Sequence, residues 1–311
     1  MSDVETTVIT GAGIAGVHAA ESLRKEGYQG RIVLMDRDQQ IPYDRPPLSK
    51  DWMTGEKDDE RILLRDPSIY EQLDIDLNLG VEVTGIDPVH KTIDTKDGSS
   101  YEWDKLMLTT GSKLRTLSIN GDDLKGIFYL RRMADAIAMK QHMNNVEDAV
   151  IIGAGFIGAE LASSLKHLGI NVTIVERSSY PMENIFGRQI SEYFLDLHRR
   201  HGVDVITDDS IGQFNGETSV EEAVTVEGRR IPCQAVMIGV GVTPNTEVSH
   251  PQLQIERGYV VNEYGETSVP DIYAAGDCTS WPYNGMPIHI EHWDHAVSHA
   301  KTVAQNMIHP K

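Results

Sequence analysis

The chain has 311 residues, of which 40% are hydrophobic, and a formal net charge of −19. This length is sufficient for two domains that each bury a core. The negative charge argues against general affinity for nucleic acid or for an anionic membrane surface.

The N-terminus reads "MSDVE" and lacks the basic and apolar regions of a signal peptide. No apolar run approaches the length needed to span a bilayer. The only cysteines, Cys233 and Cys278, form no CxxC pair and are interpreted as reduced thiols. We therefore expect a cytoplasmic protein.

Residues 6–36, "TTVITGAGIAGVHAAESLRKEGYQGRIVLMD", predict a strand, a glycine turn, an amphipathic helix ended by Gly27, and a second strand. In such a unit the first glycine makes a tight turn, the second lets the backbone approach a pyrophosphate, and the third lets the helix pack closely. The pyrophosphate binds at the helix N-terminus. Asp36 ends the second strand, 20 residues after Gly16, where an acid accepts hydrogen bonds from a ribose.

The next distinctive stretch is "IPYDRPPLSK", residues 41–50. Its prolines remove backbone freedom from a loop that carries two cations, Arg45 and Lys50. An ordinary surface loop with a solvated lysine is the alternative interpretation.

Residues 81–108 predict an antiparallel excursion with a hairpin turn at Asp97–Gly98. Its last strand ends at Thr109, Thr110 and Gly111.

Residues 148–176, "DAVIIGAGFIGAELASSLKHLGINVTIVE", repeat the first glycine unit, with a helix ended by Gly169. The terminal acid is Glu176, 18 residues after Gly158. Two such units predict two bound dinucleotides, although one copy could be vestigial. Glu176 would repel a 2′-phosphate and so favours NADH, whereas the following Arg177 would tolerate some NADPH.

Aligning the two copies by their glycines places Glu160 where the first copy has His18. We expect Glu160 in the first helical turn, where the helix dipole favours an acid. A solvated acid near the start of the helix is the alternative.

Three later segments complete the pattern. Residues 203–238 predict a second antiparallel excursion, with its turn at Glu227–Gly228. The stretch "MIGVGVTPN" contains Gly241, and "VPDIYAAGDCTSWP" predicts a strand ending at Gly276–Asp277. An acid there suits a chain of hydroxyl groups near a phosphate, or alternatively caps the following turn.

Near the C-terminus, His292, His295 and His299 have helical spacing. No acid or cysteine completes a known metal-binding spacing, so no metal site is expected.

Taken together, "GAGIAG", "IPYDRPPLSK", "LMLTTG", "GAGFIGAE", "GVGVTPN" and "DIYAAGDC" resemble the FAD-dependent members of the pyridine nucleotide-disulfide oxidoreductase superfamily. Within it, "PYDRPPLSK" is similar to the branch of ferredoxin, putidaredoxin and rubredoxin reductases, Rieske dioxygenase reductase components and apoptosis-inducing-factor relatives. The resemblance runs from about residue 6 to 308. Disulfide reductases of the wider group carry a redox cysteine pair that this chain lacks.

The resemblance implies an α/β fold with two Rossmann-like dinucleotide-binding domains, each with a small antiparallel excursion. The FAD domain would comprise residues 1–112 and 244–311, and the NAD(P)H domain residues 113–243. Relatives usually continue into a C-terminal α+β domain, whereas this sequence ends at "AQNMIHPK".

The resemblance also implies the site residues. The expected FAD contacts are Gly11, Ala12, Gly13, Ile14, Ala15, Gly16, Asp36, Arg37, Arg45, Lys50, Val83, Thr110, Gly111, Arg131, Asp277 and Trp293. The expected NADH contacts are Gly153, Gly155, Phe156, Ile157, Gly158, Glu160, Glu176, Arg177 and Gly241.

The implied reaction passes a hydride from NADH to flavin N5 and then single electrons to a ferredoxin or rubredoxin-like carrier, as part of an oxygenase system. Lys50 is expected beside N5 and paired with Glu160, and these two are the catalytic candidates. Trp293 and Trp52 would cover the flavin, or would simply be buried aromatic residues.

Two alternatives remain. An NADH oxidase or peroxidase would need a redox cysteine in the segment occupied by Arg45–Leu48, which has none. An apoptosis-inducing-factor-like flavoprotein would sense redox state instead of turning over rapidly. A monomer or a homodimer is expected in either case.

Overall fold

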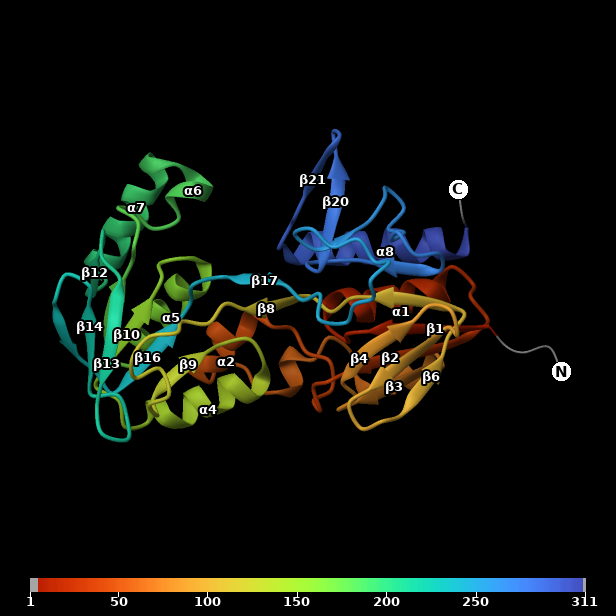
Figure 1. Cartoon of the computed structure of the whole chain (residues 1–311). Helices are drawn as coiled ribbons and strands as arrows, with labels where there is room; N and C mark the ends of the chain where they lie inside the picture. The colour runs from red at the N-terminus through yellow and green to blue at the C-terminus, as the bar shows by residue number, and fades with distance from the viewer. Residues whose placement is uncertain (1–4, 310–311) are drawn as a thin grey trace. The chain divides into compact units, whose positions relative to one another are not determined.

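The computed structural model describes residues 5–309 and divides into two compact units (Figure 1). The first unit contains the chain up to Asp44, Leu63–Lys113 and the chain from Thr243. The second contains Arg45–Ile62 and Leu114–Val242. The N-terminal residues 1–4, in which the sequence predicts no signal peptide, lie outside the described residues.

The first unit is built on a five-stranded sheet in which all neighbours are parallel, in the order β19-β7-β1-β2-β3. The strands are β1 (Thr6–Thr10), β2 (Arg31–Asp36), β3 (Ile75–Leu79), β7 (Lys105–Leu108) and β19 (Ile272–Ala274). The chain leaves β1 toward β2 on one side, and β7 lies on the other. The carboxyl end of β1 is therefore a switch point, where such sheets bind ligands.

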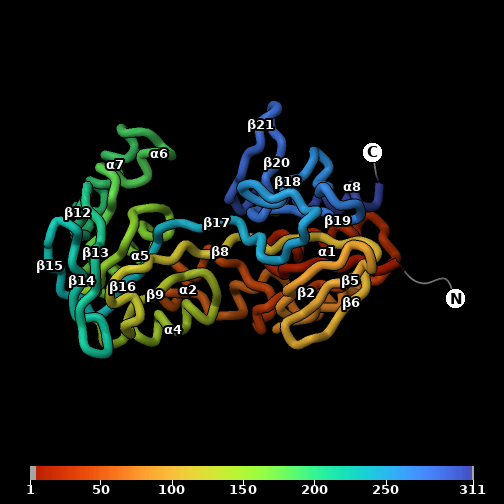
Figure 2. Tube along the Cα trace, in the orientation of Figure 1, coloured from red at the N-terminus to blue at the C-terminus, as the bar shows by residue number. Residues whose placement is uncertain are grey.

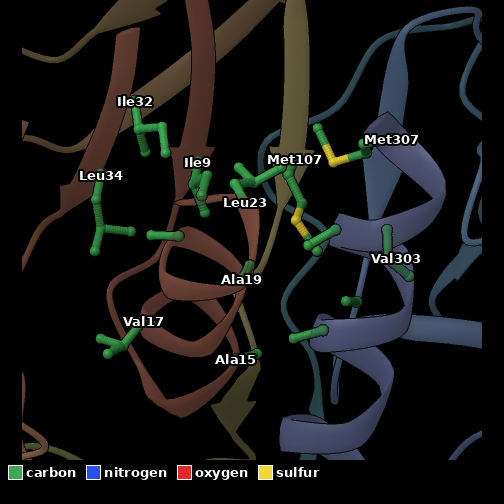
Figure 3. Packing of buried hydrophobic residues seen from close by; sticks show 14 of the residues in the cluster. Ile9, Ala15, Val17, Ala19, Leu23, Ile32, Leu34, Met107, Val303 and Met307 are labelled. Atoms are coloured by element: carbon green, nitrogen blue, oxygen red, sulfur yellow. The ribbon is translucent and has the colours of Figure 1, made fainter. Parts of the chain in front are cut away.

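Buried clusters cover both faces of this sheet, in keeping with the mainly apolar strands β2 (RIVLMD), β7 (KLML) and β19 (IYA). Ile9 and Met107 belong to a core cluster with helices α1 (Ile14–Lys25) and α8 (Trp293–Ile308), whereas Val8 and Leu106 belong to a cluster on the opposite face. Figure 3 shows α1 and α8 packed side by side, with Ala19, Leu23 and Val303 among the labelled residues.

The remaining elements of the first unit are short. The three-stranded antiparallel sheet β4-β5-β6 confirms the excursion predicted before residue 108, with Gly98 in its turn at φ +87°. The bounds are α3 (Pro67–Gln72), β4 (Val83–Asp87), β5 (Thr92–Thr95), β6 (Ser100–Glu102), β18 (Tyr259–Val260), β20 (Thr279–Tyr283) and β21 (Met286–Ile288). Two of the four unit boundaries fall within β8 (Ser112–Leu114) and β17 (Val242–Pro244).

The second unit repeats the parallel sheet, in the order β12-β11-β10-β16-β9. The strands are β9 (Ile127–Tyr129), β10 (Asp148–Ile152), β11 (Asn171–Val175), β12 (Val203–Ile206) and β16 (Ala235–Ile238). The helices are α2 (Asp51–Thr54), α4 (Met133–Met143), α5 (Phe156–His167), α6 (Glu183–Phe186) and α7 (Arg188–Arg200), with the 3-10 helices η1 (Pro46–Ser49) and η2 (Glu60–Ile62).

The second predicted excursion is also confirmed. The strands β13 (Ile211–Asn215), β14 (Glu222–Thr225) and β15 (Arg230–Pro232) form an antiparallel sheet, whose course is traced in Figure 2. Phe214 and Ala223 from this sheet join Val150 and Ile152 of β10 in one buried cluster. The predicted α/β class with two Rossmann-like cores is therefore correct.

The compact units differ from the predicted division at one segment. Arg45–Ile62 lies in the second compact unit, whereas the expected FAD domain includes it, and the functional domain bounds stay a prediction. Lys140 on α4 donates to the Trp52 carbonyl at 2.6 Å and lies 4.4 Å from the centre of its indole ring. Ser164 on α5 donates to the Ser49 carbonyl at 2.7 Å. These contacts attach the segment to two helices, and sequence proximity to the first glycine unit does not reveal them.

Among the described residues, no helix combines the length and the apolar character needed to cross a membrane.

The glycines of the second unit give a matched test of packing. A Cβ atom at Gly158 would lie 2.0 Å from the Gly153 carbonyl oxygen, whereas one at Gly155 would meet nothing within 4 Å. We expect Gly158→Ala to destabilise the chain by about 2 kcal/mol or more, because backbone must move, and Gly155→Ala to change stability by less than about 0.5 kcal/mol. Thermal unfolding without added ligand measures both, and equal melting temperatures for the two variants would contradict the packing argument.

Candidate functional site

The first glycine loop lies at the carboxyl end of β1. Gly11 has φ +108°, a conformation that favours glycine, and a Cβ atom there would lie 2.4 Å from the Thr109 carbonyl oxygen. A Cβ atom at Gly16 would lie 1.9 Å from the Gly11 carbonyl oxygen. The first and third glycines are therefore needed for the close contact between the loop, the end of β7 and α1.

The second glycine loop reproduces this geometry at the carboxyl end of β10. Gly153 has φ +95°, and its Cβ atom would lie 2.5 Å from the Gly239 carbonyl oxygen beyond β16. Gly158 stands in the position of Gly16. Both copies in the sequence thus form the same strand-loop-helix structure.

The two terminal acids bind their own loops in the same way. Asp36 accepts a hydrogen bond from Ala12 N at 2.6 Å and another from Asp38 N at 2.8 Å. Glu176 accepts from Ala154 N at 2.7 Å and from Ser178 N at 2.8 Å. Each carboxylate is held beside its glycine loop and retains further acceptor capacity, because two oxygens offer about four lone-pair positions.

The residues at both loops fit a dinucleotide. The N-cap residues Gly13 and Gly155 are extended, their helices have no side-chain cap, and neither helix has an acid in its first turn. The first backbone N–H groups of a 12-residue helix are then available to an anion, and the dipole favours one. The open space at Gly155 leaves room for a ligand to approach the backbone.

Further expected residues gather near the first loop. A Cβ atom at Gly276 would lie 3.2 Å from Cβ of Ala15, so the turn before Asp277 lies against the first turn of α1. Ser112 donates to Asp277 at 3.1 Å. Thr110 donates to the Asn245 carbonyl at 2.6 Å, and Gly111 accepts from Asn245 N at 2.8 Å. Asp277 and the end of β7 thus flank the same loop.

Three other expected residues lie in the first unit. Trp293 is the first residue of α8, 46% exposed, and its indole N–H donates to Asp44 at 2.9 Å. Arg37 lies 3.9 Å from Glu247, and Val83 begins β4. Their roles toward FAD stay predictions.

The Lys50–Glu160 pairing is confirmed within the second unit. The Lys50 amino group lies 2.9 Å from Oε1 of Glu160. The expected position of Glu160 in the first turn is wrong, however. The helix α5 begins at Phe156, which makes Glu160 its fifth residue, and the first turn holds no acid. The carboxylate is therefore held by side-chain partners more than by the helix dipole.

The remaining expected contacts also belong to the second unit. Arg45 precedes η1, and the N–H groups of Arg131 and Arg132 donate to Asp135 at the start of α4. Arg177 is exposed next to Glu176, and Gly241 accepts from Arg115 N at 3.1 Å. Arg45 and Arg131 lie in the second unit, whereas the first glycine loop lies in the first, and their expected contacts with FAD stay predictions.

Both cysteines are buried and unpaired in the described chain. Burial raises the pKa of the Cys233 thiol to about 12 and that of the Cys278 thiol to about 11. Neither thiol is therefore a ready nucleophile.

The C-terminal histidines lie beside Trp281, with the rings of His295 and His299 5.0 Å apart. Burial lowers the pKa of His299 to about 4, and its Nδ1 accepts from Gly276 N at 3.3 Å. Within residues 5–309, no group of three or more possible ligands is arranged to hold a metal ion.

Sequence reasoning missed three residues that hold the expected ones in place. Ser112 binds Asp277, Asp44 binds Trp293, and Ser49 donates to Glu160 at 2.6 Å. Ser49 and Asp44 lie in the "IPYDRPPLSK" stretch, but no spacing or periodicity there marks them as partners of Glu160 and Trp293.

The family model of the pyridine nucleotide-disulphide oxidoreductases matches residues 5–300. The biphenyl dioxygenase system ferredoxin–NAD(+) reductase component of Paraburkholderia xenovorans (strain LB400) is 34% identical over 90% of this chain and 68% of that protein. Rhodocoxin reductase of Rhodococcus erythropolis is 35% identical over 96% of this chain and 71% of that protein.

Among solved structures, the covalent putidaredoxin reductase–putidaredoxin complex contains a chain similar to this one. It matches with a TM-score of 0.94 and 31% identity over 98% of this chain and 75% of that chain. The repeated loops, the duplicated parallel sheets and these matches agree, and the chain belongs to the pyridine nucleotide-disulphide oxidoreductase family.

Proposed function

We propose that this chain is an FAD-containing, NADH-dependent reductase of a ferredoxin-type iron–sulfur carrier. The observation that carries the proposal is the pair of equivalent sites, each with a bare helix N-terminus and an acid held beside the glycine loop. The names of the relatives support the same reaction, since they include a ferredoxin–NAD(+) reductase component and a putidaredoxin reductase.

We assign FAD to the first unit and NADH to the second. The first loop has a second carboxylate near it, Asp277, in addition to Asp36. Two carboxylates suit a ligand that presents ribityl hydroxyls as well as a ribose. Glu176 alone suits the adenosine ribose of NADH, and its charge opposes the 2′-phosphate of NADPH.

When bound, FAD supplies hydride acceptance from NADH and release of electrons one at a time to the carrier. The protein supplies position and charge. Lys50 would offer an ammonium that offsets the negative charge arriving with a hydride, and Glu160 pairs with that ammonium at 2.9 Å. No side-chain base is required, because no proton leaves a carbon in this step.

The two buried thiols, with pKa values raised to about 12 and about 11, support electron transfer to an external carrier over thiol-based NADH oxidase or peroxidase chemistry. We further propose a cytoplasmic monomer or homodimer.

The direct test is NADH-dependent reduction of cytochrome c with ferredoxin, with rubredoxin and with neither. A carrier-dependent rate is expected. Equal rates in all three would count against a carrier reductase, and slow flavin reduction with a long-lived charge-transfer band would favour the redox-sensing alternative.

Replacing Glu176 tests the nucleotide assignment. We expect Glu176→Ala to raise the NADPH to NADH ratio of kcat/KM about tenfold or more, because two hydrogen bonds to a charged acceptor and a repulsion are lost together. Glu227→Ala removes an exposed acid from the β14–β15 turn of the same unit and should leave the ratio unchanged. An unaltered ratio in Glu176→Ala would reject the assignment.

Replacing Lys50 tests the role of its charge. We expect Lys50→Ala to slow flavin reduction by NADH about tenfold while FAD binding weakens much less, because a nearby ammonium favours the electron-rich product. Stopped-flow absorbance gives the rate, and flavin content after desalting gives retention. Lys57→Ala is the control, since Lys57 lies in the same segment and pairs with Asp51 at 2.9 Å. Equal rates in the two variants would refute the role.

A further inference from the structure

The serine immediately before Lys50 binds the same carboxylate as Lys50. Ser49 is 4% exposed and ends η1, and its hydroxyl donates to Oε2 of Glu160 at 2.6 Å. Lys50 binds the other oxygen, Oε1, at 2.9 Å. Two consecutive residues therefore hold both oxygens of one side chain.

Helix α5 holds Ser49 at a second point. Ser164 lies four residues after Glu160, which places both side chains on the same face of the helix. The buried hydroxyl of Ser164 donates to the Ser49 carbonyl at 2.7 Å. The helix thus binds the side chain of Ser49 through Glu160 and its main chain through Ser164.

The Ser49 hydroxyl has a competing local acceptor, the Pro46 carbonyl at 3.3 Å. A hydroxyl carries a single hydrogen, and the shorter contact to a charged oxygen is the stronger one. The hydroxyl is therefore directed toward Glu160 rather than back to its own turn.

The Lys50–Glu160 pair needs such support. Their side chains are 41% and 29% exposed, and ion pairs with this exposure fix two long side chains poorly. A buried serine has a short side chain, which loses little conformational entropy when its hydroxyl forms a hydrogen bond. A charge-assisted hydrogen bond from it therefore holds the carboxylate in one rotamer. Lys50 also donates to the Pro46 carbonyl at 3.3 Å, which leaves one of its three N–H groups for another acceptor.

We propose that Ser49, supported by Ser164, is a positioning residue that fixes the Glu160 carboxylate and through it the Lys50 ammonium. This inference rests on the proposed reductase function, because that function gives the ammonium its task. It assigns Ser49 no contact with a cofactor. Its effect on flavin reduction is expected to pass entirely through Lys50.

The first experiment compares Ser49→Ala with Ser191→Ala in the FAD-loaded chain. Ser191 is fully buried in α7, and its hydroxyl has no hydrogen-bond partner in the described part of the chain, so it controls for loss of a buried hydroxyl. We expect Ser49→Ala to lower the limiting rate of flavin reduction about 3- to 10-fold, with the apparent Kd for NADH within about twofold. Ser191→Ala should change neither quantity.

The second experiment asks whether Ser49 acts through Lys50. In a Lys50→Ala background, Ser49→Ala should have no further effect on the limiting rate, because the group it positions is gone. A purely structural serine would slow both backgrounds equally, and that result would overturn the proposal.

The third experiment needs no cofactor. In the full chain without added FAD, amide hydrogen exchange across Pro46–Thr54 should quicken in both Ser49→Ala and Ser164→Ala but not in Ser191→Ala. If Ser49→Ala does not fold, Ser164→Ala still decides, since it releases the Ser49 carbonyl and leaves the hydroxyl in place.

The wild-type chain distinguishes a failure of the proposed function from a failure of the positioning role of Ser49. A wild-type chain that is not reduced by NADH would refute the proposed function, and the exchange data would still report on the serine contacts. A wild-type chain that is reduced, with Ser49→Ala matching Ser191→Ala in both rate and exchange, would refute the positioning role alone.

Discussion

The structure depends on one close backbone approach, made twice. At Gly16 and at Gly158 the helix lies so close to the preceding loop that a Cβ atom would be only 1.9 and 2.0 Å from a loop carbonyl oxygen, far inside van der Waals contact. This approach sets the distance between helix and sheet, and it brings the helix N-terminus to the carboxyl end of the central strand. The uncapped helix N-terminus and the acid held beside each loop lie together at that point because of this approach.

The two units share the hydrogen bonds of the glycine loop as well as its shape, but they differ in the residues that surround the loop. Asp36 and Glu176 each accept a hydrogen bond from the backbone N–H of the second residue of their own glycine loop. Each also accepts one from the N–H of the residue two positions after itself. The first unit adds Asp277, held by Ser112 next to α1. The second adds the Arg45–Ile62 segment, held by Lys140 and Ser164. The same loop geometry with different additions is consistent with the proposed binding of FAD in one unit and NADH in the other.

The Arg45–Ile62 segment changes how the "IPYDRPPLSK" motif is understood. From the sequence, its prolines and cations suggest one wall of the hydride-transfer site. In the structure its last residues are held by α5, where one Glu160 oxygen accepts a hydrogen bond from the Ser49 hydroxyl and the other pairs with the Lys50 ammonium. The lysine is the conspicuous residue, but a half-exposed ion pair contributes little by itself. The position of the Lys50 ammonium therefore depends on the buried serine that precedes it, Ser49.

The sequence by itself determined the features that local backbone chemistry encodes. The glycine spacing, the apolar strands and the acids at strand ends predict the duplicated loops and the α/β class, because each depends on residues within one unit of about 30 positions. Even the Lys50–Glu160 pair could be predicted, through the resemblance and the alignment of the copies. Only the tertiary structure decided that Arg45–Ile62 packs on α4 and α5, that Glu160 is the fifth helical residue, and that Ser49, Ser112 and Asp44 hold the expected residues. Such contacts join residues far apart in the chain through single hydroxyls or carboxylates, which leave no periodicity or spacing to read.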